Sequence, residues 1–199
     1  RTDGLEAAAV RLRQLEDLQG PDRIRVEYLT DFVLAATGQA YAALLKSSEQ
    51  LKTLPVDDPF YPLMTLLAAE AAIASDNDKV AIDLLNNKDL AWAGTLQQIV
   101  LMRRGDAASG LGEYPQALIE YHKLFDSAAL FDSYPRSRGR AARAAFAVGE
   151  YRLAARFYKN LGRQLVDKPQ ADLAFYAAAA ANYDLGETEW AQIGLQKVF

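Results

Sequence analysis

The 199-residue sequence contains no cysteine and a single histidine, His122. The lack of cysteine excludes a disulfide framework, a thiolate zinc site and a cysteine nucleophile. One histidine is too few for a histidine-rich metal site. No run of about 18 apolar residues occurs, so we expect no membrane-spanning helix. Val, Ile and Thr together account for only 22 residues, which argues against a β-rich fold.

Alanine is the residue in excess, with 36 copies in the chain. It has the highest helix propensity, and its small side chain lets neighbouring helices approach closely. The apolar fraction of 51% and the charged fraction of 24% are ordinary for a globular protein. The net charge of −4 identifies no class of partner. The composition therefore predicts an all-α fold of closely packed helices.

An internal repeat of 37 residues runs through the C-terminal half of the chain. Gly112, Gly149 and Gly186 mark it, and each is followed by a glutamate. Three more columns keep the same step, namely Gly105, Ala142 and Ala179, then Ala117, Ala154 and Ala191, then Tyr121, Tyr158 and Leu195. A glycine at a helix end supports a left-handed turn, and a glutamate suits the start of the next helix. Each period is therefore predicted to be a helical hairpin.

A fainter copy of the repeat lies upstream. Ala69 and Ala81 occupy the two small columns there, and Asp76-Asn77-Asp78 replaces the glycine turn. Another copy is centred on Gly38. An amphipathic helix opens the chain. The expected helices cover residues 2–18, 22–36, 39–53, 60–75, 78–86, 90–110, 113–130, 135–148, 150–165, 169–185 and 187–199.

These columns resemble the tetratricopeptide repeat family, whose units are helix–turn–helix pairs of about 34 residues. The resemblance covers residues 60–199 well and residues 22–54 weakly, and residues 2–54 are interpreted as divergent N-terminal helices. It implies a single domain over 1–199, built as a right-handed superhelical solenoid of antiparallel helix pairs with about four to five repeats. The chain departs from the family in its period of 36–37 residues. It also departs at Arg138, which occupies the first-helix column where the family has an aromatic residue.

The resemblance further implies a binding function without catalysis or cofactor. In this family the first helices line a concave groove that binds peptides or protein segments. The residues agree with a non-enzyme, because no catalytic partner pattern surrounds His122. The glycines end helices rather than forming a phosphate-binding loop, and Asp76-Asn77-Asp78 lacks the spacing of a calcium loop.

The basic residues indicate where a partner would bind. Between Arg136 and Arg163 the net charge is +7, which leaves −11 for the rest of the chain. Three of these arginines follow i, i+4, i+7 spacing and share one helix face, which the resemblance places in the groove. The predicted partner-binding residues are Arg103, Arg136, Arg140, Arg143, Phe146, Tyr176 and Tyr183. Arginine pairs well with carboxylates and tyrosine supplies contact area, so an acidic protein or peptide is the expected partner.

Three alternatives remain open at this point. The arginines are also consistent with a solvated helix face that balances acidic residues on neighbouring repeats. The apolar C-terminal helix, with Trp190, Ile193 and Phe199, is also consistent with an assembly module that acts through its convex face or self-associates through this end. Nucleic-acid binding through the basic window is disfavoured by the isoelectric point near 5.1.

The first residues, Arg1-Thr2-Asp3-Gly4, include no methionine, so we expect the chain to be part of a longer protein. The segment Asp132–Ser137 resembles linkers in bacterial envelope members of the repeat family. Together with the lack of cysteine, it favours a periplasmic or cell-envelope location in a bacterium over the cytoplasm.

Overall fold

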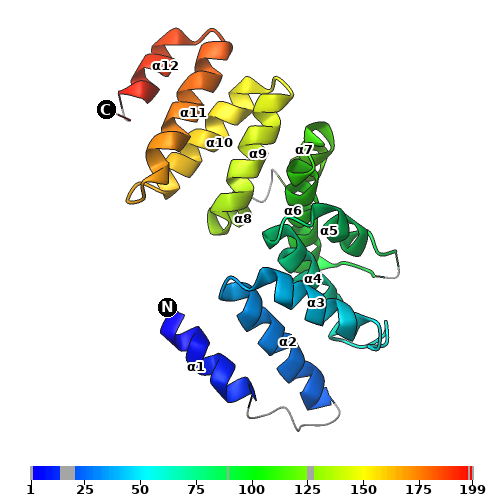
Figure 1. Cartoon of the computed structure of the whole chain (residues 1–199). Coiled ribbons are helices and arrows are strands. Elements are labelled where there is room, and N and C mark those ends of the chain that lie inside the picture. The colour runs from blue at the N-terminus through cyan, green and yellow to red at the C-terminus, as the bar shows by residue number, and fades with distance from the viewer. Residues whose placement is uncertain (1, 14–20, 89, 125–127, 197, 199) are drawn as a thin grey trace. The chain divides into compact units, whose positions relative to one another are not determined.

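The computed structural model describes residues 2–13, 21–88, 90–124, 128–196 and 198, and these residues form helices and no strand. The all-helical prediction is therefore confirmed (Figure 1). The helices are α1 (Thr2–Arg13), α2 (Pro21–Ala36), α3 (Ala40–Leu51), α4 (Tyr61–Ala74), α5 (Asp78–Leu85), α6 (Gly94–Gly110), α7 (Tyr114–His122), α8 (Ala128–Ser133), α9 (Pro135–Ala147), α10 (Tyr151–Gln164), α11 (Gln170–Asp184) and α12 (Thr188–Leu195).

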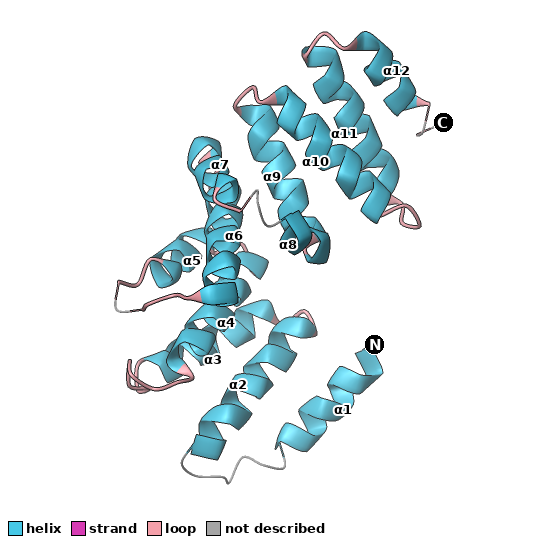
Figure 2. Cartoon of the chain, turned by 180° about the vertical axis from the view of Figure 1, so that it is seen from behind, coloured by secondary structure: helices cyan, strands magenta, loops and turns pink. Residues whose placement is uncertain are grey.

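The helices group into two compact units, Arg1–Arg103 and Arg104–Phe199. In the first unit α1 packs on α2, α2 on α3, α3 on α4 and α4 on α5. In the second unit α9 packs on α7, α8 and α10, then α10 packs on α11 and α11 on α12. Figure 2 shows α9 to α12 side by side in chain order. Packing between successive helices is what an array of helical hairpins requires.

The turns predicted from the glycine column adopt the left-handed conformation. The backbone φ angle is +79° at Gly112, +84° at Gly149, +82° at Gly186 and +85° at Gly38. Asp76 takes the same place in its hairpin with a φ of +59°. Aspartate enters this region more readily than most residues with a Cβ. The predicted turns are confirmed, including the one in which aspartate replaces glycine.

The backbone closes these five turns in the same way. The N–H group after the turn residue donates to the carbonyl oxygen five residues earlier, as in the Schellman motif. The pairs are Gln39–Leu34, Asn77–Ala72, Glu113–Ala108, Glu150–Ala145 and Glu187–Asn182, with N···O distances of 2.8 to 2.9 Å. The residue after the turn also starts the next helix, because its carbonyl oxygen accepts a hydrogen bond from the backbone N–H of the alanine four residues later. These alanines are Ala43, Ala81, Ala117, Ala154 and Ala191. All five alanines are buried, so this column fixes where each second helix begins and packs.

The two helices of the best-preserved hairpin approach closely where the small and large columns meet. A Cβ atom added at Gly105 would lie 2.6 Å from Cε1 of Tyr121. The Tyr121 side chain is fully buried, so it has no room to move aside. Gly105 therefore leaves the space that the tyrosine ring occupies within the same hairpin.

Residues 14–18 of the expected opening helix lie outside the described residues. Among the described residues, three helix boundaries differ clearly from the expected ones. The helix expected over 187–199 ends at Leu195 as α12. The helix expected over 113–130 ends as α7 at His122, and α8 forms separately. Tyr134 precedes a proline and has a non-helical backbone conformation (φ −129°, ψ 74°). It separates α8 from α9, because helical geometry is disfavoured for the residue before a proline. The helix expected from residue 90 begins at Gly94 as α6. Gly94 has a φ of +56°, which is not a right-handed helical conformation, so the helix cannot extend regularly toward residue 90.

Candidate functional site

Arg103, the first of the predicted groove residues, is neutralised within its own unit. Its Nε atom lies 2.9 Å from Oε1 of Glu70 and its Nη2 atom lies 2.8 Å from the same oxygen. Only 15% of the Arg103 side chain is exposed. This ion pair joins α6 to α4 inside the first unit, so Arg103 serves helix packing.

Arg140 makes the corresponding contact one repeat later. Its Nη1 atom donates to the backbone carbonyl of Asp106 at 2.9 Å. Arg143 reaches the carbonyl of Ser109 at 3.5 Å. Both carbonyls lie near the C-terminal end of α6, where the helix dipole favours positive charge. Arg140 is half-buried, whereas Arg143 and Arg136 are exposed, so the last two remain accessible to a partner.

Phe146 is part of the packing between hairpins. Its ring lies edge-on to Tyr151, with the ring centroids 5.3 Å apart. It packs against a buried cluster that includes Ala145 of α9 and Ala181 of α11. Burial raises the pKa of the Tyr158 hydroxyl, which packs on the same cluster, and the nearby charge of Arg143 opposes that rise.

An exposed apolar row runs along α11. Tyr176 is 55% exposed and Tyr183 is 68% exposed. Leu173, which the sequence analysis did not select, is 69% exposed and lies three residues before Tyr176. The spacing of 173, 176, 180 and 183 places these side chains on one helix face. The same spacing, read from the sequence, could have added Leu173 to the predicted partner-binding residues.

Arg138, the residue that departs from the family pattern, is buried and paired. Its Nη2 atom lies 2.5 Å from Oδ1 of Asp132, and its Nη1 atom donates to Oε1 of Gln164 at 2.9 Å. The Gln164 amide also donates to the backbone carbonyl of Asp132. The arginine therefore joins α8, α9 and α10.

A second buried polar cluster holds α6, α7 and α9 together. The Tyr121 hydroxyl donates to Oδ1 of Asp106 at 2.8 Å, and the Ser137 hydroxyl donates to Oδ2 at 2.7 Å. Asp106 is 2% exposed. One carboxylate thus satisfies two buried hydroxyl groups from different helices.

The predicted end-to-end contact residues are exposed where they are described. Trp190 is 54% exposed and Ile193 is 46% exposed, whereas Phe199 lies outside the described residues. The Nζ atom of Lys159 on α10 lies 5.4 Å from the centroid of a Trp190 ring, which is a cation–π distance. A hollow of about 220 Å³ beside this pair is also lined by Arg152 and Arg156.

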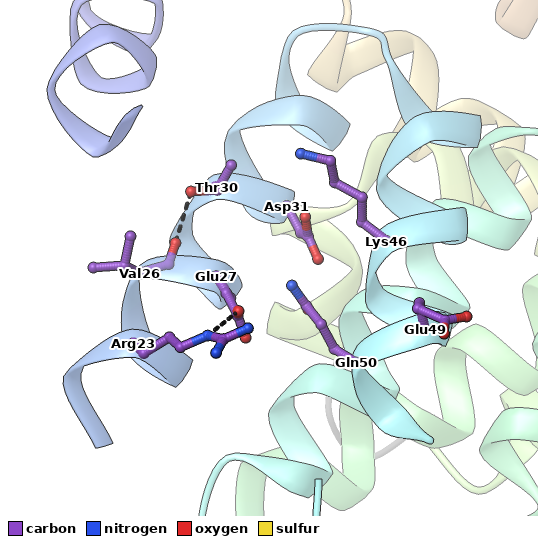
Figure 3. Close-up of a pocket in the computed structure, with 8 residues that line it drawn as sticks. All are labelled: Arg23, Val26, Glu27, Thr30, Asp31, Lys46, Glu49 and Gln50. Carbon is purple, nitrogen blue, oxygen red and sulfur yellow. Dashed lines mark hydrogen bonds and ion pairs between the residues drawn. The ribbon is translucent and has the colours of Figure 1, made fainter. Parts of the chain in front are cut away.

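The first unit contains a pocket that the sequence analysis did not predict. It has a volume of about 510 Å³ and lies between α2 and α3 (Figure 3). Its lining residues are Arg23, Val26, Glu27, Thr30, Asp31, Lys46, Glu49 and Gln50. Asp31 from α2, and Lys46 and Gln50 from α3, point toward the same space (Figure 3).

Asp31 is the unusual residue of this pocket. It is 1% exposed, and neither carboxylate oxygen has a hydrogen-bond partner. Burial raises the pKa of Asp31 to about 7, although the charge of Lys46 acts in the opposite direction and that of Glu27 adds to the rise. Oε1 of Gln50 is also buried without a partner. The pocket therefore presents three acceptor atoms that need donors.

His122 is exposed in the last turn of α7. Across the described ranges, no group of three or more histidine, aspartate or glutamate side chains is arranged to hold a metal ion. Within the same ranges, no helix has the length and apolar character needed to cross a membrane.

No protein-family model matches the chain, and no curated protein matches it. The tetratricopeptide-like interpretation therefore depends on the repeat columns and on the hairpin turns described above.

Proposed function

We propose that this chain is a non-catalytic protein-interaction scaffold of the tetratricopeptide type. The observation that carries the proposal is the exposed row of Leu173, Tyr176 and Tyr183 along α11. Soluble proteins rarely leave several large apolar side chains exposed on one helix face unless that face binds something. In the proposed superhelix, α9 and α11 are each the first helix of a helix–turn–helix pair. Their exposed side chains would line the concave groove.

The proposed ligand is an extended or helical protein segment with acidic residues. Its apolar side chains would contact the α11 row, and its carboxylates would pair with Arg136 and Arg143, which are exposed on α9. Arg103 and Arg140 serve helix packing in this proposal, because their hydrogen bonds are made to Glu70 of α4 and to the Asp106 carbonyl of α6. A bacterial cell-envelope setting, on the likeness of the segment Asp132–Ser137 to envelope linkers, is part of the proposal.

The test begins with a random peptide library selected on the purified protein. We expect the selected peptides to be rich in acidic and apolar residues. In fluorescence anisotropy, Tyr176→Ala/Tyr183→Ala should weaken their binding by about 2 kcal/mol, since tyrosines at the centre of an interface are common hot spots. Arg136→Ala/Arg143→Ala should weaken binding mainly at low salt.

The matched control for the tyrosines is Tyr41→Ala on α3, because Tyr41 is 58% exposed. Arg152→Ala/Arg156→Ala on α10 is the control for the loss of two positive charges. Equal affinity in the α11 variant and the Tyr41 control would show that the α11 row is not the binding surface.

Exposure of Trp190 and Ile193 favours a second candidate function, an assembly module that self-associates through α12. In this case sedimentation velocity of the wild type should show a mass that rises with concentration. Trp190→Ala/Ile193→Ala should remain monomeric over the same range, because both apolar contacts are lost. Self-association that persists in this variant would exclude α12 as the contact, and Leu173→Ala serves as a control on another surface.

A further inference from the structure

The pocket between α2 and α3 contains more acceptors than the chain itself satisfies. Both oxygens of Asp31 and Oε1 of Gln50 are buried and lack hydrogen-bond partners. Each such group loses its hydration without compensation, which is costly in a folded protein. Native structures usually resolve this by placing a donor in the site.

None of the donors that line the pocket is hydrogen-bonded to these three acceptor atoms. The Nε atom of Arg23 is 2.8 Å from Oε1 of Glu27. The Thr30 hydroxyl donates to the carbonyl of Val26 at 2.7 Å. Lys46 lies near enough for its charge to act on Asp31, yet no hydrogen bond joins it to either oxygen of that carboxylate. The lining residues therefore leave the acceptors to a donor from outside.

The surroundings of these acceptors indicate what kind of donor fits. The volume of about 510 Å³ is that of a small-molecule site rather than of a single ion. A second hollow of about 460 Å³ shares Arg23, Glu27 and Gln50 with the first. Its other lining residues are largely apolar, namely Ile24, Thr53, Leu54, Pro55 and Met64. A ligand with a cationic group and an aliphatic chain would fit both hollows, with the cationic group beside Asp31 and the aliphatic chain in the apolar hollow.

We propose that this pocket binds the ammonium or guanidinium group of an organic cation, with Asp31 and Gln50 accepting its hydrogen bonds. The aliphatic part of the ligand extends toward Leu54 and Met64. Such a group is carried by a free alkylamine and by a lysine or arginine side chain of another protein. The site prefers a positive charge, whereas the surface proposed on α9 and α11 prefers a negative one, so the two proposals are independent.

Ionisation of Asp31 couples this binding to pH. The carboxyl must be charged to pair with a cation, and its pKa is raised to about 7. The other charged groups that line the pocket are Arg23 and Glu27 from α2 and Lys46 and Glu49 from α3. We expect the affinity to rise about tenfold between pH 6 and pH 8, in proportion to the ionised fraction of Asp31.

The test uses defined probes and nuclear magnetic resonance on the full chain. The probes are n-butylammonium, Nα-acetyl-lysine methylamide and Nα-acetyl-arginine methylamide, with Nα-acetyl-norleucine methylamide as the neutral control. We expect saturable shifts of the backbone amides around Asp31, Lys46 and Gln50 with the cations and not with the control. Tighter binding of the two amino-acid derivatives than of n-butylammonium would identify a protein side chain as the ligand, and the reverse a free amine.

Two variants test the assigned acceptors. Asp31→Asn should raise the dissociation constant at least tenfold, and Gln50→Leu should raise it severalfold. Asp22→Asn should change it less than twofold, because Asp22 is exposed on α2, does not line the pocket and already pairs with Arg25 at 3.4 Å. Shifts that are equal for the neutral control, or an unchanged affinity in Asp31→Asn, would overturn the proposal. Asp31→Asn removes a buried charge, so it is expected to fold.

Discussion

Replacing Asp106 with alanine is expected to lower the free energy of unfolding of the second unit by about 4 kcal/mol. The carboxylate accepts hydrogen bonds from Tyr121 and Ser137, and both side chains are almost completely buried. Without it two hydroxyl groups lose their acceptor in the protein interior, at a cost of about 1–3 kcal/mol each. The variant also leaves a small cavity among α6, α7 and α9, which adds to the loss.

Hydrogen exchange of the most protected amides in residues 104–199 measures this change within one unit. Asp184→Ala is the control, because Asp184 is exposed at the end of α11, and it should change stability by less than about 0.5 kcal/mol. Tyr121→Phe should cost less than Asp106→Ala, because it removes one donor together with its need for an acceptor. A loss below about 1 kcal/mol in Asp106→Ala would show that water replaces the carboxylate at little cost.

Replacing Asp31 with asparagine is expected to stabilise the first unit at neutral and alkaline pH. The pKa of Asp31 is raised from 3.8 to about 7, so between these values the folded state holds a proton that the unfolded state has released. The stability of the wild type therefore falls as the pH rises from about 4 to about 7 and then levels off. Asparagine cannot ionise, so the variant lacks this fall. The difference reaches up to about 4 kcal/mol above pH 7, since each unit of pKa shift is worth about 1.4 kcal/mol.

Urea titrations at pH 4, 6 and 8 measure the difference. The chain has two tryptophans, and in a Trp190→Phe background the fluorescence comes from Trp92 in the first unit. Glu49→Gln, which removes an exposed carboxylate from the same pocket, should follow the wild-type pH dependence. If Asp31→Asn and the wild type keep a constant difference at all three pH values, the Asp31 carboxyl titrates near its ordinary pKa.

The hairpin turns could be predicted from the sequence because they depend on local conformation. Gly112, Gly149 and Gly186 stand where the backbone must be left-handed, and their φ angles confirm it. The spacing of the repeat also predicted the turn at Asp76, where aspartate stands in place of glycine and the backbone is again left-handed. The turn residue and the small residues on either side of it recur at the same spacing in each repeat. This recurrence allowed the helix pairs to be predicted from the spacing of these residues.

Features that depend on one specific contact were harder to predict. The sequence showed that Arg138 differs from the residue type expected in its column of the repeat. Its partner Asp132 could not be predicted, because Asp132 lies in the short helix α8 and the expected helix ended at residue 130. Arg103 was assigned to the groove from its column. Its pairing with Glu70 depends on how α4 packs on its neighbours, and no single-helix pattern reports that packing.

The Asp31 pocket was missed for a related reason. An aspartate within an otherwise mixed helix suggests a solvated position, and α2 shows no clear separation of apolar and polar faces. The available signal was that Asp31 continues the row Ile24 and Tyr28 at i, i+4, i+7 spacing. A carboxylate in line with apolar side chains is a candidate for burial, but the packing of α3 against α2 decides whether it is buried.

The recurring turn also has a consequence for how such a chain can change in length. A segment cut at two of these turns, such as residues 150–186, starts and finishes with the same backbone conformation and the same pair of closing hydrogen bonds. Tandem duplication of its coding sequence would therefore join helix to helix through a turn that the protein already forms. We expect such a duplication to extend the array by one folded module, whereas an insertion of half that length would break the register of every alanine that follows.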